Sequence, residues 1–577
     1  MTAVPAAPVV LERAGDRAGA LLRRAGLSAP PRPVIVVCGG ADDLAEPQLT
    51  VARRTLGPAV AAAASLTGAV VADGGTAAGV MALLGEQRAR DPAAMAVLLG
   101  VAPAGKVEHA GAAQEGRTPL DRHHTHVVLA DSDEWGGETP LLMALAEQLA
   151  QGRPIVMVLA GGGEGTRAEL LEGVARGWPL FVIAGTGGVA DEVVAALRSD
   201  RPPRWGRVGA VGARLSGRLG LGGRRTPPAL LRELAGGDVR VVAGDGPEPL
   251  GRSLKWELQD EPALKDAWQL FATYDGLAGR LRDSFERFQT LILLLGIAAT
   301  AIALLSAELH DTGLRWLAIA LPIVASVVVA LANRRAAGRR WVLLRAAAEA
   351  LKSEIYRCRT ATGVYSQAVL DGAGESARQR LAARLADVES KLVSSDASGG
   401  PLTPYCGSLP PVMYGAGAGD DGLSGLDASR YIEIRVSDQL AYYRGKVDGL
   451  DRVRGRLQVV MLAAGGAGAF LAAVDVAVWV GLSTTVAGAA LAYLGYLQFD
   501  STIVAYNQTA AQLATLQRDF RARDGDMPLE ELVGRGESVL TRELGGWVQQ
   551  MTEALEQQRA EQTKAATKVD PEAEKGE

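Results

Sequence analysis

The stretch TLILLLGIAATAIALLSA, residues 290–307, contains no charged residue. Its length is close to the roughly 17–25 residues that a helix needs to cross a bilayer. Three further stretches of the same character lie at residues 316–332, 459–474 and 478–497. They form two pairs, so the sequence predicts an all-α membrane region of two helical hairpins, with four transmembrane helices. For each pair the alternative is a hairpin buried in a soluble core.

The arginines around the first pair predict its orientation. Arg280, Arg282 and Arg287 precede the first stretch, and Arg334, Arg335, Arg339 and Arg340 follow the second, whereas a short turn at residues 308–315 separates the two. The excess of positive charge marks the cytoplasmic side. Residues 1–9 have no charged segment followed by an apolar core, so we expect no signal peptide. The sequence therefore predicts a multi-pass protein of the inner cell membrane with cytoplasmic soluble domains.

Composition sets wide limits on the rest of the chain. With 577 residues the chain is too long for one hydrophobic core. A formal net charge of −5 gives no support for a nucleic-acid partner. The cysteines, Cys38, Cys358 and Cys406, lie far apart and form no CxxC pair, which favours a reducing compartment.

The hairpins belong to an internal repeat. In each copy an arginine-bearing helix leads into two spans, and a long helix that begins at an aromatic residue follows them, at residues 341–359 and 506–523. The segments WVLLRAAAEALKSEI and YNQTAAQLATLQRDF have similar apolar spacing. Such faces are usually buried against a partner, so we expect a helical bundle beneath the membrane and a homo-oligomer.

The first half of the chain predicts an α/β Rossmann-like domain with a parallel sheet. Short apolar runs alternate with helical stretches from Pro33 to about Ala243, which is typical of a parallel sheet covered by helices. The expected strands are residues 34–38, 69–72, 95–101, 126–130, 155–159, 180–183 and 239–243.

Nearly all of these strands end in glycine or a small polar residue before a helix. Glycine there lets a ligand approach the backbone, and the following helix offers free N–H groups to a phosphate. The candidate nucleotide-binding residues are Gly39, Gly40, Asp73, Gly74, Gly75, Thr76, Gly161, Gly162, Gly163, Thr166, Gly185, Thr186, Gly187 and Gly188. Tight βα turns also use glycine for structural reasons alone. For Asp73, too, a ligand-binding role and a purely structural role are both open.

Three histidines, His123, His124 and His126, could indicate a metal site. His124 and His126 lie at alternate positions leading into an expected strand. No cysteine or acid pair completes a spacing typical of zinc sites. We therefore expect structural roles for them and no metal. We expect a nucleotide ligand and no cofactor.

Ordered segments of the first half resemble a known family. VLLGVAPAGKVE at residues 97–108 and LDRHHTHVVL at residues 120–129 resemble segments of the N-terminal cytosolic domain of melastatin-type TRP channels. The glycine turn at residues 161–166 and VIAGTGGVAD at residues 182–191 follow in the same order. The resemblance covers residues 33–198 and implies a TRPM-like SLOG (LSDAT) domain. Such a domain is held to sense nucleotides such as ADP-ribose or other NAD-derived ligands.

The membrane half has no six-helix channel body and resembles instead the two-span SLATT and DUF4231 modules that accompany SLOG sensors in prokaryotic conflict systems. The expected organisation is an N-terminal extension (1–32), the SLOG domain (33–250), a first two-span unit (251–365), a flexible linker (366–430), a second two-span unit (431–530), and a C-terminal helix with a disordered tail (531–577). Within the SLOG domain, residues 201–225 are expected to form a basic loop.

The segment from Gly162 to Glu169 also resembles the PGGxGTxxE signature of LOG-type nucleoside monophosphate phosphoribohydrolases. In that family the glutamate assists cleavage of an N-glycosidic bond, and Glu169 takes its place here. Gly161 stands where the family has proline, however, and no PRK-type segment supplies the catalytic arginine. We therefore expect a nucleotide sensor that signals to a transmembrane, pore-forming oligomer. The alternatives are a membrane-anchored phosphoribohydrolase and a passive scaffold.

Overall fold

The structure of the protein is a computed structural model. It describes residues 8–27, 30–40, 45–109, 116–199, 238–309, 311–335, 337–395, 397, 399–406, 409–411, 420–474, 476–496 and 498–569. The chain forms two compact units. The first comprises residues 1–261 and 418–423, and the second comprises residues 262–417 and 424–577.

An all-parallel sheet forms the centre of the first unit. Its described strands are β1 (Val9–Leu11), β2 (Val34–Gly39), β3 (Val70–Asp73), β4 (Leu98–Pro103), β5 (His126–Ala130), β6 (Ile155–Ala160), β7 (Leu180–Ile183) and β8 (Val239–Val242). They lie in the order β1-β5-β4-β3-β2-β6-β7-β8, and every pair is parallel. The central strands are apolar throughout because helices cover both of their faces.

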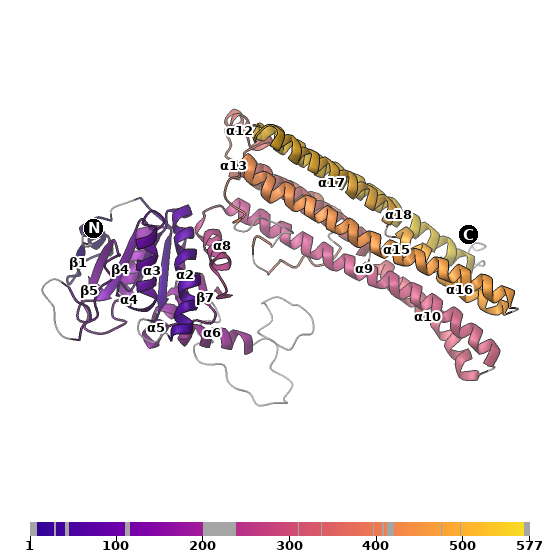
Figure 1. The fold of residues 1–577 in the computed structure, drawn as a ribbon, viewed down its shortest axis with the longest axis horizontal. Helices are drawn as coiled ribbons and strands as arrows, with labels where there is room; N and C mark the ends of the chain where they lie inside the picture. The colour runs from indigo at the N-terminus through magenta and orange to yellow at the C-terminus, as the bar shows by residue number, and fades with distance from the viewer. Residues whose placement is uncertain are drawn as a thin grey trace. The chain divides into compact units, whose positions relative to one another are not determined.

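Helices form a layer on each face of the sheet (Figure 1). One face packs against α2 (Glu46–Thr67), α3 (Gly79–Arg90) and α8 (Pro247–Leu258). The other packs against α1 (Ala18–Arg24), α4 (Thr139–Ala150), α5 (Glu164–Ala175) and α6 (Gly188–Ser199). This arrangement confirms the predicted α/β class and parallel sheet.

The N-terminal extension expected over residues 1–32 is part of this unit. β1 pairs with β5 at the edge of the sheet, and Leu21 and Leu22 of α1 are buried in the core with Val10. A three-residue strand and a two-turn helix are too short to give a clear periodic signal, which is why the sequence did not reveal them. The expected strand at residues 95–101 is β4, displaced toward the C-terminus.

The second unit is helical. Its long helices are α9 (Pro262–Leu309), α10 (Thr312–Arg335), α11 (Ala337–Arg359), α15 (Ser437–Ala473), α16 (Val480–Tyr496), α17 (Phe499–Ala522) and α18 (Leu529–Val569). The lead-in helix and the first predicted span are one continuous helix, α9. The two trailing helices predicted from the repeat are α11 and α17.

Four described helices are long and apolar enough to cross a membrane, and each overlaps one of the four predicted spans. Apolar side chains on these spans, such as Leu294, Trp316, Leu462 and Phe470, are exposed in this unit. Such an exposed apolar surface marks a membrane or protein interface. Together with the length of these helices, it favours membrane spans over hairpins buried in the core of this chain.

The flexible linker expected over residues 366–430 is partly wrong. It contains α12 (Gln367–Ala373) and α13 (Ala377–Val393), and Leu381 and Leu385 of α13 are buried where α13 packs on α9 and α11. Leucines at helical spacing were the missed signal. Of the tail expected to be disordered, residues up to Val569 continue α18. The basic loop at residues 201–225 lies outside the described residues.

Candidate functional site

The four glycine turns meet at the carboxyl edge of the sheet in the first unit. β3, β2, β6 and β7 are adjacent strands, and the turns after them hold all the candidate nucleotide-binding residues. The chain runs outward from β2 through β3, β4 and β5 on one side, and through β6, β7 and β8 on the other. The change of direction between β2 and β6 is a topological switch point, where open α/β sheets hold their ligands.

Several of these glycines are required by packing. A Cβ on Gly39 would clash with the carbonyl of Ala160, and a Cβ on Gly188 would clash with the carbonyl of Gly162. Gly162 itself has a φ of +100°, which disfavours other residues. At these positions glycine brings the β2, β6 and β7 turns close together, so its presence alone does not indicate a ligand.

The turn after β7 uses its own side chains as hydrogen-bond acceptors. Asp191 accepts from the backbone N–H of Gly185 (2.7 Å) and Gly187 (3.1 Å). The Thr186 hydroxyl accepts from the N–H of Gly161 (2.9 Å) and donates to the carbonyl of Ile183 (2.7 Å). These N–H groups were expected to face a phosphate, but here they stabilise the turns.

Helix α5 begins at the switch point, and its N-terminus has no side-chain cap among the described residues. Its N-cap residue, Gly163, has no side-chain cap hydrogen bond, and the first turn runs from Glu164 through the buried Thr166. The first N–H groups of a helix have no partner within the helix and attract anions. The turn from Gly162 to Thr166 is therefore the part of the predicted site that is best placed to hold a phosphate.

Asp73, at the end of β3, is engaged in a buried polar chain. Its Oδ1 accepts from the N–H of Gly75 (2.7 Å) and lies 2.7 Å from Nε2 of His124, whose Nδ1 lies 3.2 Å from Oδ1 of Asp121. Burial opposes protonation of the imidazole, but the two carboxylates outweigh it and raise the pKa of His124 to about 9. Asp73 therefore pairs with an imidazolium at neutral pH and holds the Gly74–Gly75 turn, while Oδ2 of Asp73 and the hydroxyl of Thr76 are buried without a partner.

The other histidines have local contacts. His123 accepts from Arg122, and His126 lies 2.8 Å from the Thr125 hydroxyl. Within the described ranges, no group of three or more His, Cys, Asp or Glu side chains is placed to hold a metal ion.

Glu169, on α5, belongs to a group of acidic residues beside the switch point. Burial raises the pKa of its carboxyl to about 8; the negative charges of Glu138 and Asp73 add to this rise, and the Cys38 thiol opposes it by hydrogen bonding. A carboxyl group that is protonated at neutral pH can donate a proton, but it cannot stabilise a ribosyl cation. Cys38 and Glu138 were missed from the sequence, although strand alternation already places Cys38 on the same face of β2 as Val34 and Val36, toward α4 and α5.

Three family models match the chain in succession. Residues 32–211 match "SLOG in TRPM, prokaryote", residues 271–369 match "Protein of unknown function (DUF4231)", and residues 431–547 match "SMODS and SLOG-associating 2TM effector domain 1" (SLATT). This succession is the architecture expected from the sequence. The matches describe a membrane effector with a nucleotide-binding-type domain.

One curated relative is the rat (Rattus norvegicus) transient receptor potential cation channel subfamily M member 2. It is 29% identical over 173 residues, covering 23% of this chain and 11% of the channel. The chain therefore spans about a tenth of that relative's length.

Two solved structures are also similar. The molybdenum cofactor binding protein of Rippkaea orientalis covers 30% of this chain and 87% of its own, with 16% identity and a TM-score of 0.22. The structural-genomics target TM1055 covers 28% of this chain and 79% of its own, with 21% identity and a TM-score of 0.20.

Proposed function

We propose that the chain is a membrane effector whose α/β unit binds a nucleotide and passes the binding event to the membrane helices. The observation that carries this proposal is the uncapped N-terminus of α5 at the switch point, in a chain that also has four membrane-length helices. A nucleotide phosphate would accept from the N–H groups between Gly162 and Thr166. Gly39 and Gly40, at the end of β2, would allow its close approach.

The ligand class follows from the family resemblance. Prokaryotic SLOG domains of the TRPM type point to ADP-ribose or another NAD-derived nucleotide. A diphosphate bridge would suit the β2–β6 crevice, where the end of β2 and the first turn of α5 flank the switch point.

Transmission would use the continuity of the chain. α9 begins at Pro262, just after the last helix of the first unit, and continues through the first span to Leu309. A continuous helix can carry a displacement along its axis into the membrane. With the soluble parts in the cytoplasm, several copies would together form a pore, because four small spans enclose little space.

A self-capping variant tests this site. Aspartate is a preferred N-cap residue, so Gly163→Asp should keep α5 stable while its carboxylate occupies the N–H groups and repels phosphate. We expect ADP-ribose, NAD or a nucleoside monophosphate to raise the thermal midpoint of the full-length protein, and Gly163→Asp to abolish the shift. Ala168→Asp adds the same charge on an exposed position of α5 and should keep the shift. If none of these nucleotides raises the thermal midpoint of the wild-type protein, nucleotide binding is contradicted.

The second candidate is a phosphoribohydrolase, and the position of Glu169 beside the switch point favours it. This function predicts release of free base from a nucleoside monophosphate by the full-length protein, and its loss in Glu169→Gln. Nucleotide binding without release of free base would support the sensor function and contradict the phosphoribohydrolase.

A further inference from the structure

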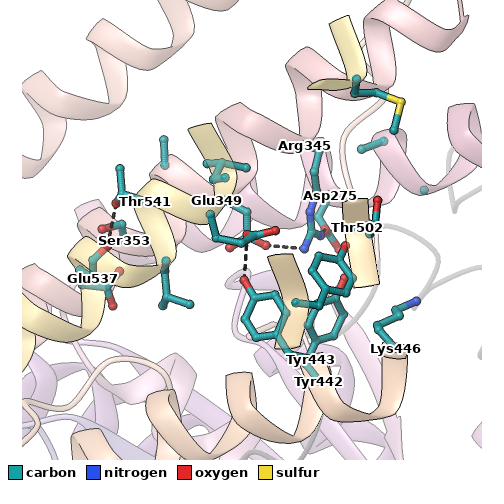
Figure 2. A pocket seen from close by; sticks show the side chains of 18 of the residues that line it. Asp275, Arg345, Glu349, Ser353, Tyr442, Tyr443, Lys446, Thr502, Glu537 and Thr541 are labelled. Carbon is teal, nitrogen blue, oxygen red and sulfur yellow. Dashed lines mark hydrogen bonds and ion pairs between the residues drawn. The ribbon is translucent and has the colours of Figure 1, made fainter. Parts of the chain in front are cut away.

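The helical unit contains a cavity of about 520 Å³ among α9, α11, α15, α17 and α18 (Figure 2). Its lining lies outside the apolar stretches. Asp275 and Arg282 precede the first span, Lys446 precedes the third, and Arg345 and Tyr506 follow the second and fourth. The cavity therefore lies at the end of both hairpins that is away from their turns. A volume of this size suits a small molecule.

Three cations line this part of the cavity: Arg282, which pairs with Glu286 (2.7 Å), Arg345 and Lys446. Arg345 is paired through Nη1 with Asp275 and through Nη2 with Glu349, both at 2.6 Å. Lys446 forms no ion pair with any residue that the structure describes, and its ammonium lies 5.6 Å from the ring centre of Tyr442. Burial, followed by the charges of Arg282 and Arg345, lowers the pKa of Lys446. Like charges held this close are relieved by an added anion.

A second unsatisfied donor group is buried in the lining. Arg435 lies on a π-helical turn (Ile432–Val436) just before α15, and it is 1% exposed. Its Nε (2.9 Å) and Nη2 (3.1 Å) donate to Glu537, and its guanidinium lies 4.8 Å from the ring centre of Tyr356. Its Nη1 is buried without a hydrogen-bond partner among the residues that the structure describes. A buried donor without a partner is costly, which points to a ligand acceptor in this cavity.

Three tyrosines line the cavity beside these cations. The rings of Tyr442 and Tyr443 lie 5.4 Å apart and those of Tyr443 and Tyr506 lie 5.2 Å apart, all edge to face. The Tyr443 hydroxyl donates to Glu543 (2.9 Å). Rings of this kind offer an apolar surface with polar ends, which suits a ring or an alkyl chain next to a charged group.

We propose that this cavity binds a small organic phosphate, with the phosphate at Lys446 and Arg282 and the organic part against Tyr442, Tyr443 and Tyr506. The phosphate could belong to a soluble molecule or to the headgroup of an anionic phospholipid, since the cavity adjoins the membrane spans. This site is separate from the nucleotide site of the α/β unit. Because its lining comes from helices that continue into both hairpins, an occupied cavity holds the two lead-in segments together.

The acidic residues of the lining are compatible with an anion. Asp275 and Glu349 neutralise Arg345, and Glu537 neutralises Arg435. Burial raises the pKa of Glu543 to about 7, with Glu349 adding to the rise and Tyr443 and Arg345 opposing it. Because Glu543 takes up a proton near neutral pH, phosphate binding should become stronger as the pH falls from 8 to 7, above the pKa of about 6 at which a phosphate monoester itself is protonated.

The test uses the full-length protein in nanodiscs of pure phosphatidylcholine, titrated with glycerol 3-phosphate. AMP is titrated into the Gly163→Asp background, in which the proposed nucleotide site of the α/β unit is blocked. A second arm replaces part of the lipid with phosphatidylglycerol. The readout is the thermal midpoint of the protein. Lys446→Gln removes the unpaired cation, Tyr506→Phe keeps the ring but removes the hydroxyl, and Arg444→Gln removes an exposed charge two residues away on the same helix as the matched control.

We expect a saturable rise of the midpoint in wild type and Arg444→Gln. In Lys446→Gln the affinity should be about tenfold weaker, as expected for one charge-assisted hydrogen bond. Tyr506→Phe should give a smaller loss. A response to the soluble phosphates assigns a soluble ligand, and a response to phosphatidylglycerol alone assigns a lipid. Responses that are absent, or equal in Lys446→Gln and Arg444→Gln, would overturn the proposal whether or not the α/β unit binds nucleotide.

Discussion

At the residue scale, His124 links two buried carboxylates at the edge of the proposed nucleotide site. Its pKa in the folded protein, about 9, exceeds the ordinary value of 6.5. The stabilisation is therefore complete below about pH 6.5 and is lost as the pH rises through 9. We expect the free energy of unfolding of the α/β unit to fall over this range.

His124→Asn should remove most of that pH dependence. It should also destabilise the unit by about 3–5 kcal/mol, because Asp73 loses its buried partner. Labelling of the buried Cys38 thiol in urea reports unfolding of this unit alone. His123→Asn, at a half-buried neighbour, should leave the midpoint nearly unchanged. Equal destabilisation in both variants would contradict the role of the His124 pair.

Glu169 predicts the same direction of change over a lower pH range. Its folded pKa of about 8 lies above the ordinary value of 4.5, so the folded state keeps a proton that the unfolded state has released. Stability therefore falls as the pH rises from 4.5 to 8. Glu169→Gln, neutral at every pH, should unfold at higher urea than wild type at pH 8.5 and at similar urea near pH 5. A variant that is less stable at pH 8.5 would show that the ionised carboxylate is stabilising.

At the scale of elements, the sequence predicted the long and periodic parts. Fully apolar runs became β2, β5, β6 and β7, and arginine-flanked apolar stretches became the spans. The sequence did not reveal β1 or α1, because short elements owe their stability to tertiary contacts. Helix α13 was missed although its leucines lie at helical spacing. The sequence located the glycine turns. It could not show that Asp191 and Thr186 accept hydrogen bonds from some of the N–H groups in these turns, because that depends on side-chain geometry.

The buried pair of Arg435 and Glu537 joins the start of α15 to α18. Both side chains are at most 1% exposed, and Tyr431 also donates to Glu537. Arg435→Met should cost about 3–5 kcal/mol, since it leaves Glu537 buried without its cation. The double variant Arg435→Met/Glu537→Leu should recover most of this loss in chemical unfolding of the detergent-solubilised protein. Additive losses in the double variant would show that the two residues act independently.

At the scale of the whole molecule, the chain combines a parallel sheet, whose carboxyl edge carries the candidate nucleotide-binding turns, with two membrane hairpins. Trp479 and Glu308, in the turns of the two hairpins, form a hydrogen bond of 2.9 Å, so the hairpins contact each other at their turns. α16 also packs against α9. The two hairpins therefore form one structural unit, in which a displacement of α9 can reach both.

The central claim is that nucleotide binding to the α/β unit changes the state of the membrane helices. The most direct measurement is dye release from liposomes that contain the full-length protein with its soluble units outside, with and without ADP-ribose or NAD. We predict ligand-dependent release by wild type and Ala168→Asp, and none by Gly163→Asp. Ligand-independent release, or no release although the nucleotide binds, would contradict the account.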